Sequence, residues 1–169
     1  NTYSEACYSG APATQNVGDC SDGTQTCSGG TMGGCVGEVL PAQETCGGGD
    51  EDCDGTVDEE DADNCTTYYL DVDDDTFGLV SDSKCLCAPA GDYTATQPGD
   101  CDDTDGNIHP SATETCATVG IDDNCNNVAD EENATGCDDY FRNDDSDTHG
   151  VTGDSKCLCA AAAPYDVLL

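Results

Sequence analysis

Acidic side chains recur at fixed spacing in residues 50–61, where they could bind a metal ion. Carboxylates fall at loop positions 1, 3, 5, 9 and 12, with glycine at position 6 and valine at position 8. This is the pattern of an EF-hand-type calcium loop, with Asp in place of Glu at position 12. The glycine permits the tight coil that lets positions 1, 3 and 5 converge on one ion. The expected ligands are Asp50, Asp52, Asp54, the carbonyl of Thr56, Asp58 and Asp61; the alternative is a solvated acidic turn.

Further acidic stretches follow related spacings. The second loop has Thr76 where an EF-hand has glycine, so its geometry must differ; its expected ligands are Asp71, Asp73, Asp75, the carbonyl of Phe77, and Asp82. Its copy offers Asn143, Asp145, Asp147, the carbonyl of His149, and Asp154. A third stretch offers Asp103, Asp105, Asn107 and Glu114, with Asp100 and Asp102 close by. The copy of the opening loop offers Asp122, Asn124, Asn126 and Asp130, and its lower charge predicts either a low-affinity site or a structural turn.

The chemical type of the expected ligand atoms indicates which metal ion the loops would bind. All the expected ligands are hard oxygens, which favour Ca²⁺ over Mg²⁺, an ion that keeps more of its own waters. Zinc is not expected, because His109 and His149 are the only histidines and have no paired spacing. Copper(I) favours methionine and free thiols, and Met32 is the only methionine. We therefore expect calcium as the cofactor.

A long internal repeat organises the chain from Glu44 onward. Glu44–Cys46 returns as Glu114–Cys116 at an offset of 70, and Asp82–Cys87 returns unchanged as Asp154–Cys159 at an offset of 72. The expected organisation is an N-terminal disulfide module in residues 1–40, a first acidic metal-binding repeat in residues 41–110, and a second, truncated repeat in residues 111–169.

Composition limits the fold. Leu, Ile, Val and Phe together number 21 of 169 residues and the net charge is −34, so a hydrophobic core alone would not hold the chain together. Disulfides and cations must supply the stability. One strand is expected in residues 65–70, which are rich in Thr and Tyr. We otherwise predict an irregular, β-poor, loop-rich fold of small disulfide- and metal-stabilised repeats, stacked as an elongated rod of tandem repeats.

The 15 cysteines indicate a disulfide scaffold made in an oxidising compartment. Four fall in the N-terminal module, where two disulfides are expected. The repeat spacing explains the odd number by truncation of the second copy, leaving Cys157 or Cys159 to pair outside the chain. The connectivity is open; Cys46–Cys53 and Cys116–Cys125 are the favoured local pairs. The two cysteines of each Cys-Leu-Cys segment are expected to have different partners.

Several runs together resemble the MopE-like metal-binding-motif repeats of secreted bacterial proteins. The resemblance rests on residues 40–46 and 50–59, on residues 69–78, and on residues 99–105 followed by His109-Pro110. Residues 7–10, 23–27 and 34–37 are similar to the module that often precedes such repeats. The resemblance implies an extracellular or cell-surface location and acidic repeats that bind metal. The family takes its name from a copper-associated member, whereas the ligands in this sequence favour calcium.

These patterns predict an extracellular calcium-binding structural protein, the repeat unit or subunit of a surface stalk, adhesin or filament; the alternative is a soluble secreted metal buffer or scavenger. The expected partners are calcium ions and further copies of the chain in a fibre or tandem array. With three Lys and Arg residues, nucleic acid is not an expected partner, and no apolar stretch predicts membrane insertion. No catalytic constellation is present, so an enzyme is not expected. Sequons predict N-glycosylation at Asn64 and Asn133.

Overall fold

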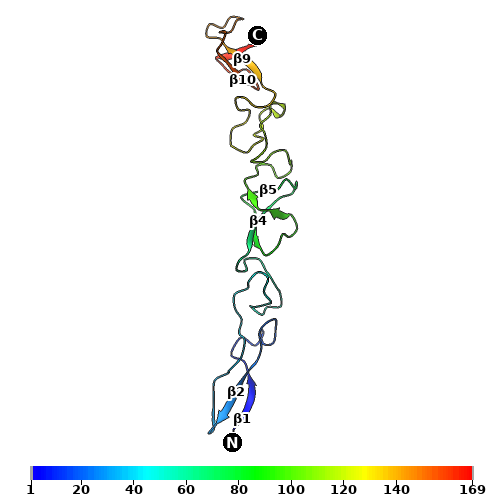
Figure 1. The fold of residues 1–169 in the computed structure, drawn as a ribbon, viewed down its shortest axis with the longest axis vertical. Helices are drawn as coiled ribbons and strands as arrows, with labels where there is room; N and C mark the ends of the chain where they lie inside the picture. The colour runs from blue at the N-terminus through cyan, green and yellow to red at the C-terminus, as the bar shows by residue number, and fades with distance from the viewer. Residues whose placement is uncertain (1, 169) are drawn as a thin grey trace. The chain divides into compact units, whose positions relative to one another are not determined.

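Short β-strands are the main regular elements of the computed structural model, which describes residues 2–168 (Figure 1). A single turn of 3₁₀ helix, η1 (Cys116–Thr118), accompanies them in the described part of the chain. The strands are β1 (Tyr3–Cys7), β2 (Gly23–Ser28), β3 (Thr31–Met32), β4 (Thr66–Leu70), β5 (Phe77–Gly78), β6 (Ser83–Leu86), β7 (Tyr93–Ala95), β8 (Gln97–Pro98), β9 (Asp138–Arg142), β10 (Ser155–Leu158) and β11 (Tyr165–Leu168).

The predicted β-poor, elongated rod of tandem repeats is wrong. The strands form three three-stranded sheets, in the orders β1-β2-β3, β6-β4-β7 and β10-β9-β11, and the pair β5-β8. The chain divides into two compact units: residues 1–68 with 83–93, and residues 69–82 with 94–169. Neither unit is one copy of the sequence repeat, because the first copy contributes residues to both. The expectation of a loop-rich, disulfide-stabilised chain does hold, whereas the sequence boundaries near residues 40 and 110 stay a prediction.

Sequence repetition is visible in the strands themselves. Strands β4, β6 and β7 start 72 residues before β9, β10 and β11, respectively. In each of the two sheets, the strand that comes first in the sequence, β4 or β9, lies in the middle. Strand β9 pairs antiparallel with β10 and with β11. The Thr- and Tyr-rich segment predicted at 65–70 is thus confirmed as β4. Propensity explains its formation, and a disulfide from Cys65, just before it, fixes it to β6 at Cys85.

The N-terminal sheet belongs to the first unit. Strands β1 and β2 pair antiparallel with Tyr3 opposite Cys27 and Cys7 opposite Gly23, and β2 continues into the β3 hairpin. The Cys7–Cys35 disulfide closes this module. The second disulfide predicted within the module is absent, because Cys20 bonds Cys53 of the following acidic loop instead.

Seven disulfides hold the two units, and each lies within one unit. The predicted local pairs Cys46–Cys53 and Cys116–Cys125 are wrong: Cys53 bonds Cys20 and Cys125 bonds Cys101. Cys46 and Cys116 bond the second cysteine of each Cys-Leu-Cys segment, and Cys65 and Cys137 bond the first. The prediction that these two cysteines have different partners is therefore confirmed.

The odd cysteine is Cys27, which is buried in β2. The prediction that Cys157 or Cys159 lacks a partner in the chain is wrong. Cys101 lies within the predicted first repeat, residues 41–110, but it bonds Cys125 of the second repeat, as Cys20 bonds Cys53 of the first. Each repeat therefore has a complete set of six cysteines, and the surplus thiol is in the N-terminal module.

The interior contains more acid than an ordinary core. The buried apolar residues are Cys20, Cys27, Cys53, Ala62, Phe77, Ala95, Ile108 and Ala134. The buried polar residues are Glu44, Asp50, Asp71, Asp100, Asp103, Glu114, Asp123 and Asn143. Buried carboxylates require partners, and the acidic loops supply many of them from backbone N–H groups. In residues 2–168 no helix has the length and apolar character needed to cross a membrane.

Candidate metal centres

The acidic loop that follows β4 gathers three carboxylates in the second unit. Asp71, Asp73 and Asp75 have oxygens within 4.8 Å of one another. One oxygen of each is held in place: Asp71 accepts from the Thr94 hydroxyl at 3.2 Å, Asp73 from the N–H of Asp75 at 3.3 Å, and Asp75 from the N–H of Phe77 at 2.7 Å. These local bonds coil the loop without a glycine at position 6, and they leave one oxygen of each carboxylate free to face the others.

A second acidic segment, which we call the cap (Gly99–Asp103), closes over this loop. The N–H groups of Gly99 and Asp100 donate to the carbonyl of Gly78, and Asp103 accepts the N–H of Val72 at 2.9 Å. Beyond the cap, His109 stacks on Phe77 with 5.0 Å between ring centroids. The second and third acidic stretches predicted from sequence are therefore brought together at one place, around Asp71, Asp73, Asp75, Asp100 and Asp103.

Four oxygens at this place are buried and have no hydrogen-bond partner in the described structure. They are Oδ1 of Asp71 and Oδ2 of Asp73, Asp75 and Asp100. Asp71 is 4% exposed and Asp100 is 6% exposed. Burial, followed by the charge of Asp75, raises the pKa of Asp73, and burial likewise raises the pKa of Asp100. Ionised carboxylates packed in this way repel one another, and a bound cation removes the repulsion.

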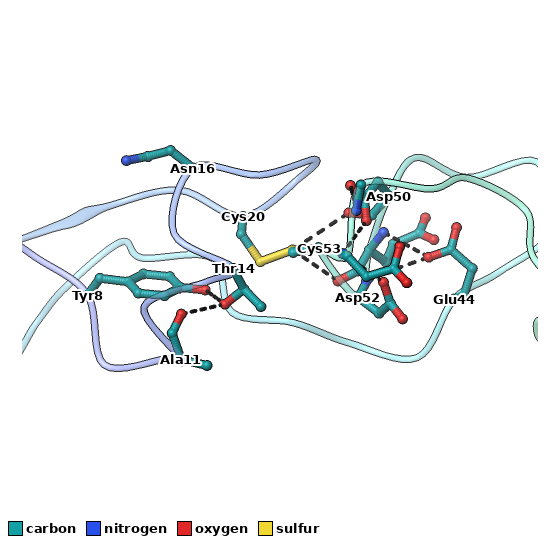
Figure 2. Close-up of a disulfide and its surroundings, with 12 residues drawn as sticks. Tyr8, Ala11, Thr14, Asn16, Cys20, Glu44, Asp50, Asp52 and Cys53 are labelled. Carbon is teal, nitrogen blue, oxygen red and sulfur yellow. Dashed lines mark hydrogen bonds between the residues drawn. A yellow bond between two sulfur atoms is a disulfide. The ribbon is translucent and has the colours of Figure 1, made fainter.

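The opening loop forms a second acidic centre, in the first unit, beside the Cys20–Cys53 disulfide (Figure 2). Asp50 accepts the N–H groups of Asp54 and Gly55, each at 3.0 Å, so both of its oxygens shape the turn. Gly55 has φ = +100°, the conformation that the sequence pattern required of it. Asp52, Asp54 and Glu59 have oxygens within 4.8 Å of one another.

Glu59 was missed by the sequence analysis. Both of its carboxylate oxygens are buried and have no hydrogen-bond partner within residues 2–168. The nearby N–H of its own backbone lowers the pKa of Glu59, but burial and the charges of Glu44 and Asp54 outweigh this effect and raise the pKa. The signal lay in the sequence, since Glu59 is position 10 of the loop. The EF-hand register drew attention to positions 9 and 12 instead.

Two buried glutamates organise the loops from outside the predicted ligand set. Glu44 accepts the N–H groups of Glu51, Asp52 and Asp58. Its counterpart Glu114 accepts those of Asp123 and Asp130. Glu114 was expected in the third acidic stretch, but it supports the copy of the opening loop.

That copy repeats the backbone arrangement with amides among its side chains. Asp122 accepts the N–H groups of Asn126 and Asn127, as Asp50 does in the first copy. The amide groups of Asn124 and Asn126 both donate to Glu131, and the bond from Asn126, followed by that from the Glu131 backbone, lowers the pKa of Glu131. Oxygens of Asn124, Asp130 and Glu131 remain buried with no hydrogen-bond partner in the described part of the chain. An oxygen-lined centre is therefore present here with less charge.

The loop after β9 copies the loop after β4. Asn143 is 9% exposed, its amide donates to the carbonyl of Asp147 at 3.0 Å, and its oxygen has no hydrogen-bond partner among residues 2–168. Asp147 accepts the N–H of His149, as Asp75 accepts that of Phe77. A cavity of about 220 Å³ is lined by Arg142, Asn143, Asp144, Asp145, Asp147, His149, Gly150 and Val151.

Other predicted ligands have different surroundings. Asp58 accepts the N–H of Gly47 at 2.6 Å and Asp61 is exposed. Asp102 accepts the Thr104 hydroxyl, Asp105 the amide of Asn107, and Asp154 the Tyr165 hydroxyl. The side chain of Thr56 is on the surface, and its N–H donates to Asp54. Asp82 lies at the end of the second loop, where its carbonyl accepts the N–H of Leu70. These positions stay predictions, as do the sequon residues Asn64 and Asn133, which are exposed.

The donor set fits a hard cation better than copper. The carboxylate and amide oxygens at the four centres are ligands that calcium prefers. His109 is stacked on Phe77 and His149 is exposed at the rim of its cavity. The sulfurs near Asp58 and Asp100 belong to disulfides and are not thiolate donors. The structure thus offers no cluster of nitrogen or sulfur ligands within residues 2–168.

Comparison with known proteins supports a metal-binding assignment. No curated protein and no solved structure matches the chain. A family model does match, in residues 41–59 and 100–131, and these residues include the opening loop, part of the cap, and the copy of the opening loop. Its description is "Putative metal-binding motif", under the name Cu-binding MopE. Two segments of the chain are therefore similar to the motif that this family model describes.

Proposed function

We propose that the chain is an extracellular calcium-binding structural protein, a subunit of a surface stalk, adhesin or filament. The observation that carries the proposal is the convergence of Asp71, Asp73, Asp75 and Asp100, with one buried, unpartnered oxygen on each within the described structure. Ca²⁺ takes six to eight oxygen ligands, several of them carboxylates, and the loops present such oxygens already positioned.

Composition and cross-linking support a structural role. The chain has a net charge of −34 and a small apolar interior, so bound cations would offset a large self-repulsion. Seven disulfides are typical of proteins made for an oxidising environment, which supports secretion. Calcium would then complete a scaffold that cross-links alone leave with buried like charges.

Chelation separates this proposal from its alternative, a secreted metal buffer. The seven disulfides favour the alternative, because they could keep the fold without metal. We expect EDTA to lower the melting temperature of the oxidised chain and to expand it in small-angle scattering, with recovery on adding CaCl₂. Unchanged melting and dimensions, together with calcium uptake, would support the buffer. Titration with Cu²⁺ in parallel tests the metal, and copper uptake that blocks calcium uptake would contradict a calcium protein.

A further inference from the structure

The loop after β9 has the same framework as the loop after β4 but lacks its cap. In the first copy, the backbone N–H of Leu70 donates to the carbonyl of Asp82, and the N–H of Leu79 donates to the carbonyl of Leu70. In the second copy, 72 residues later, the backbone N–H of Arg142 donates to the carbonyl of Asp154, and the N–H of Val151 donates to the carbonyl of Arg142. The two loops therefore have the same backbone framework. A difference in exposure between equivalent residues must come from the segments that cover each loop.

Equivalent residues of the two loops differ in solvent exposure. Phe77 is 9% exposed because β8 and His109 cover it, whereas the side chain of its counterpart His149 is 83% exposed. The carbonyl of Gly78 accepts two N–H groups from the cap, and Gly150, its counterpart, borders the open cavity. The Asn143 oxygen is buried with no hydrogen-bond partner in the described residues, and the amide nitrogen of the same side chain donates to the Asp147 carbonyl of this loop. The second loop thus has the inner half of a cation site, and no segment within residues 2–168 covers it as the cap covers the first loop.

A segment with the chemistry of the cap occurs at one other place in the sequence. Gly18-Asp19-Cys20-Ser21-Asp22 matches Gly99-Asp100-Cys101-Asp102-Asp103 at four of five positions. Each segment starts with a glycine at positive φ, 51° for Gly18 and 113° for Gly99. Each is tied by its cysteine to an equivalent loop residue, through Cys20–Cys53 and Cys101–Cys125. Gly99–Asp103 covers the loop after β4, whereas Gly18–Asp22 contacts the opening loop, where the N–H of Asp19 donates to the carbonyl of Asp50 at 2.9 Å. The exposed side chains of Gly18–Asp22 remain open to a further partner.

We propose that residues 18–22 of a second copy of this chain cap the loop at residues 143–151, with a calcium ion held between Asn143, Asp145 and Asp147 and the acids of the incoming segment. The proposal rests on the proposed calcium function. Both surfaces are acidic, so they repel without a cation and attract through one. The contact joins two different surfaces, so it adds copies head to tail, in an open filament or a closed ring.

The carboxylates of the incoming segment are available. Asp19 is exposed, and Asp22 is held by exposed hydrogen bonds from Gln15 at 2.7 Å and Asn16 at 3.4 Å. Exposed hydrogen bonds exchange with water at little cost, so Asp22 can change partners. In the capped loop, Asp103 accepts the N–H of Val72, and Asp22 would accept the N–H of Asp144 in the same way.

Sedimentation velocity on the full oxidised chain tests the contact. Wild type should form larger species with CaCl₂ and revert to monomer with EDTA. D19N/D22N and D145N/D147N should each stay monomeric in calcium, and their mixture should form a heterodimer through the one intact pair of surfaces. That heterodimer also shows that both variants fold. E5Q/D92N, which removes the same charge elsewhere on the surface, should assemble like wild type.

Four results would overturn the contact. Wild type that takes up calcium in isothermal titration yet remains monomeric contradicts it and leaves the proposed calcium function standing. Assembly of D19N/D22N to the wild-type extent also contradicts it, as does failure of the two blocked variants to pair when mixed. Absence of any calcium uptake by the wild type overturns the proposed function and this contact together.

Discussion

Asp103 accepts the backbone N–H of Val72 at 2.9 Å, across 31 residues of sequence. This bond joins the cap to the loop after β4 and turns two acidic stretches into one centre. Asp103 itself is buried, and its neighbour in the cap, Asp100, has a buried oxygen with no hydrogen-bond partner in the described structure and is close enough for its charge to raise the pKa of Asp73. Calcium binding should therefore depend on both segments together.

Replacing Asp100 with Asn should have opposite effects with and without calcium. In EDTA the variant should be more stable than wild type at neutral pH, because one charge of a buried, repelling group is removed. In CaCl₂ it should be less stable, since a charged ligand is lost and calcium affinity falls by about tenfold. Thermal melting in both buffers measures the effect, with the exposed Asp92→Asn as control. A variant that melts below wild type in both buffers would contradict repulsion at this centre.

The stability of wild type and of Asp100→Asn in EDTA should depend on pH in a way that follows from the raised pKa values. Burial raises the pKa of Asp73 and of Asp100, so in EDTA the folded chain binds their protons more tightly than the unfolded chain does. Their unfavourable contribution is therefore absent at a pH below the unfolded values, near 4, and grows as pH rises through the raised folded values. The advantage of Asp100→Asn over wild type in EDTA should shrink as pH falls. Denaturant melts from pH 3 to 8 measure it, and an advantage that grows toward low pH would be inconsistent with these raised values.

Glu59 and its neighbour Glu60 provide a matched pair in the opening loop. Glu59→Gln should weaken calcium binding to the first unit, because both oxygens of Glu59 are buried and unpartnered in the described structure. Glu60→Gln removes an exposed ion pair with Lys84 at 3.3 Å, which contributes about 0.5 kcal/mol or less, and should leave calcium binding unchanged. Isothermal titration compares them. Equal affinities for the two variants would remove Glu59 from the site.

The surplus cysteine predicts a single reactive thiol. Without reductant, the native chain should resist iodoacetamide because Cys27 is buried, and the denatured chain should gain one adduct at Cys27. Peptide mass spectrometry locates the adduct. An adduct on Cys157 or Cys159 would contradict the connectivity and restore the truncation explanation of the odd cysteine.

The sequence was most informative where function depends on local spacing. Alternate acids in residues 71–75 do lie together, because a tight loop turns every second side chain toward its centre. The turn around Asp50 and the positive φ of Gly55 could be predicted for the same reason, because both depend on local spacing. Glu59 was missed because an EF-hand places its last ligand with the help of a following helix, and none follows here in residues 2–168.

Long-range pairing could not be predicted from spacing. Cys46 and Cys53 are close in sequence, yet Cys53 bonds Cys20 and Cys46 bonds Cys87, at sequence separations of 33 and 41 residues. Strands were underestimated for a related reason. Short, exposed segments such as β1 carry little apolar signal, and pairing with β2 together with the Cys7–Cys35 disulfide makes them strands.

An anomalous difference map from crystals grown in CaCl₂ tests the calcium centre most directly. We predict a peak between Asp71, Asp73, Asp75 and Asp100, with oxygen ligands at about 2.3–2.6 Å. A map in which these carboxylates surround no ion, or in which they hold copper in preference to calcium when both are supplied, would contradict the account.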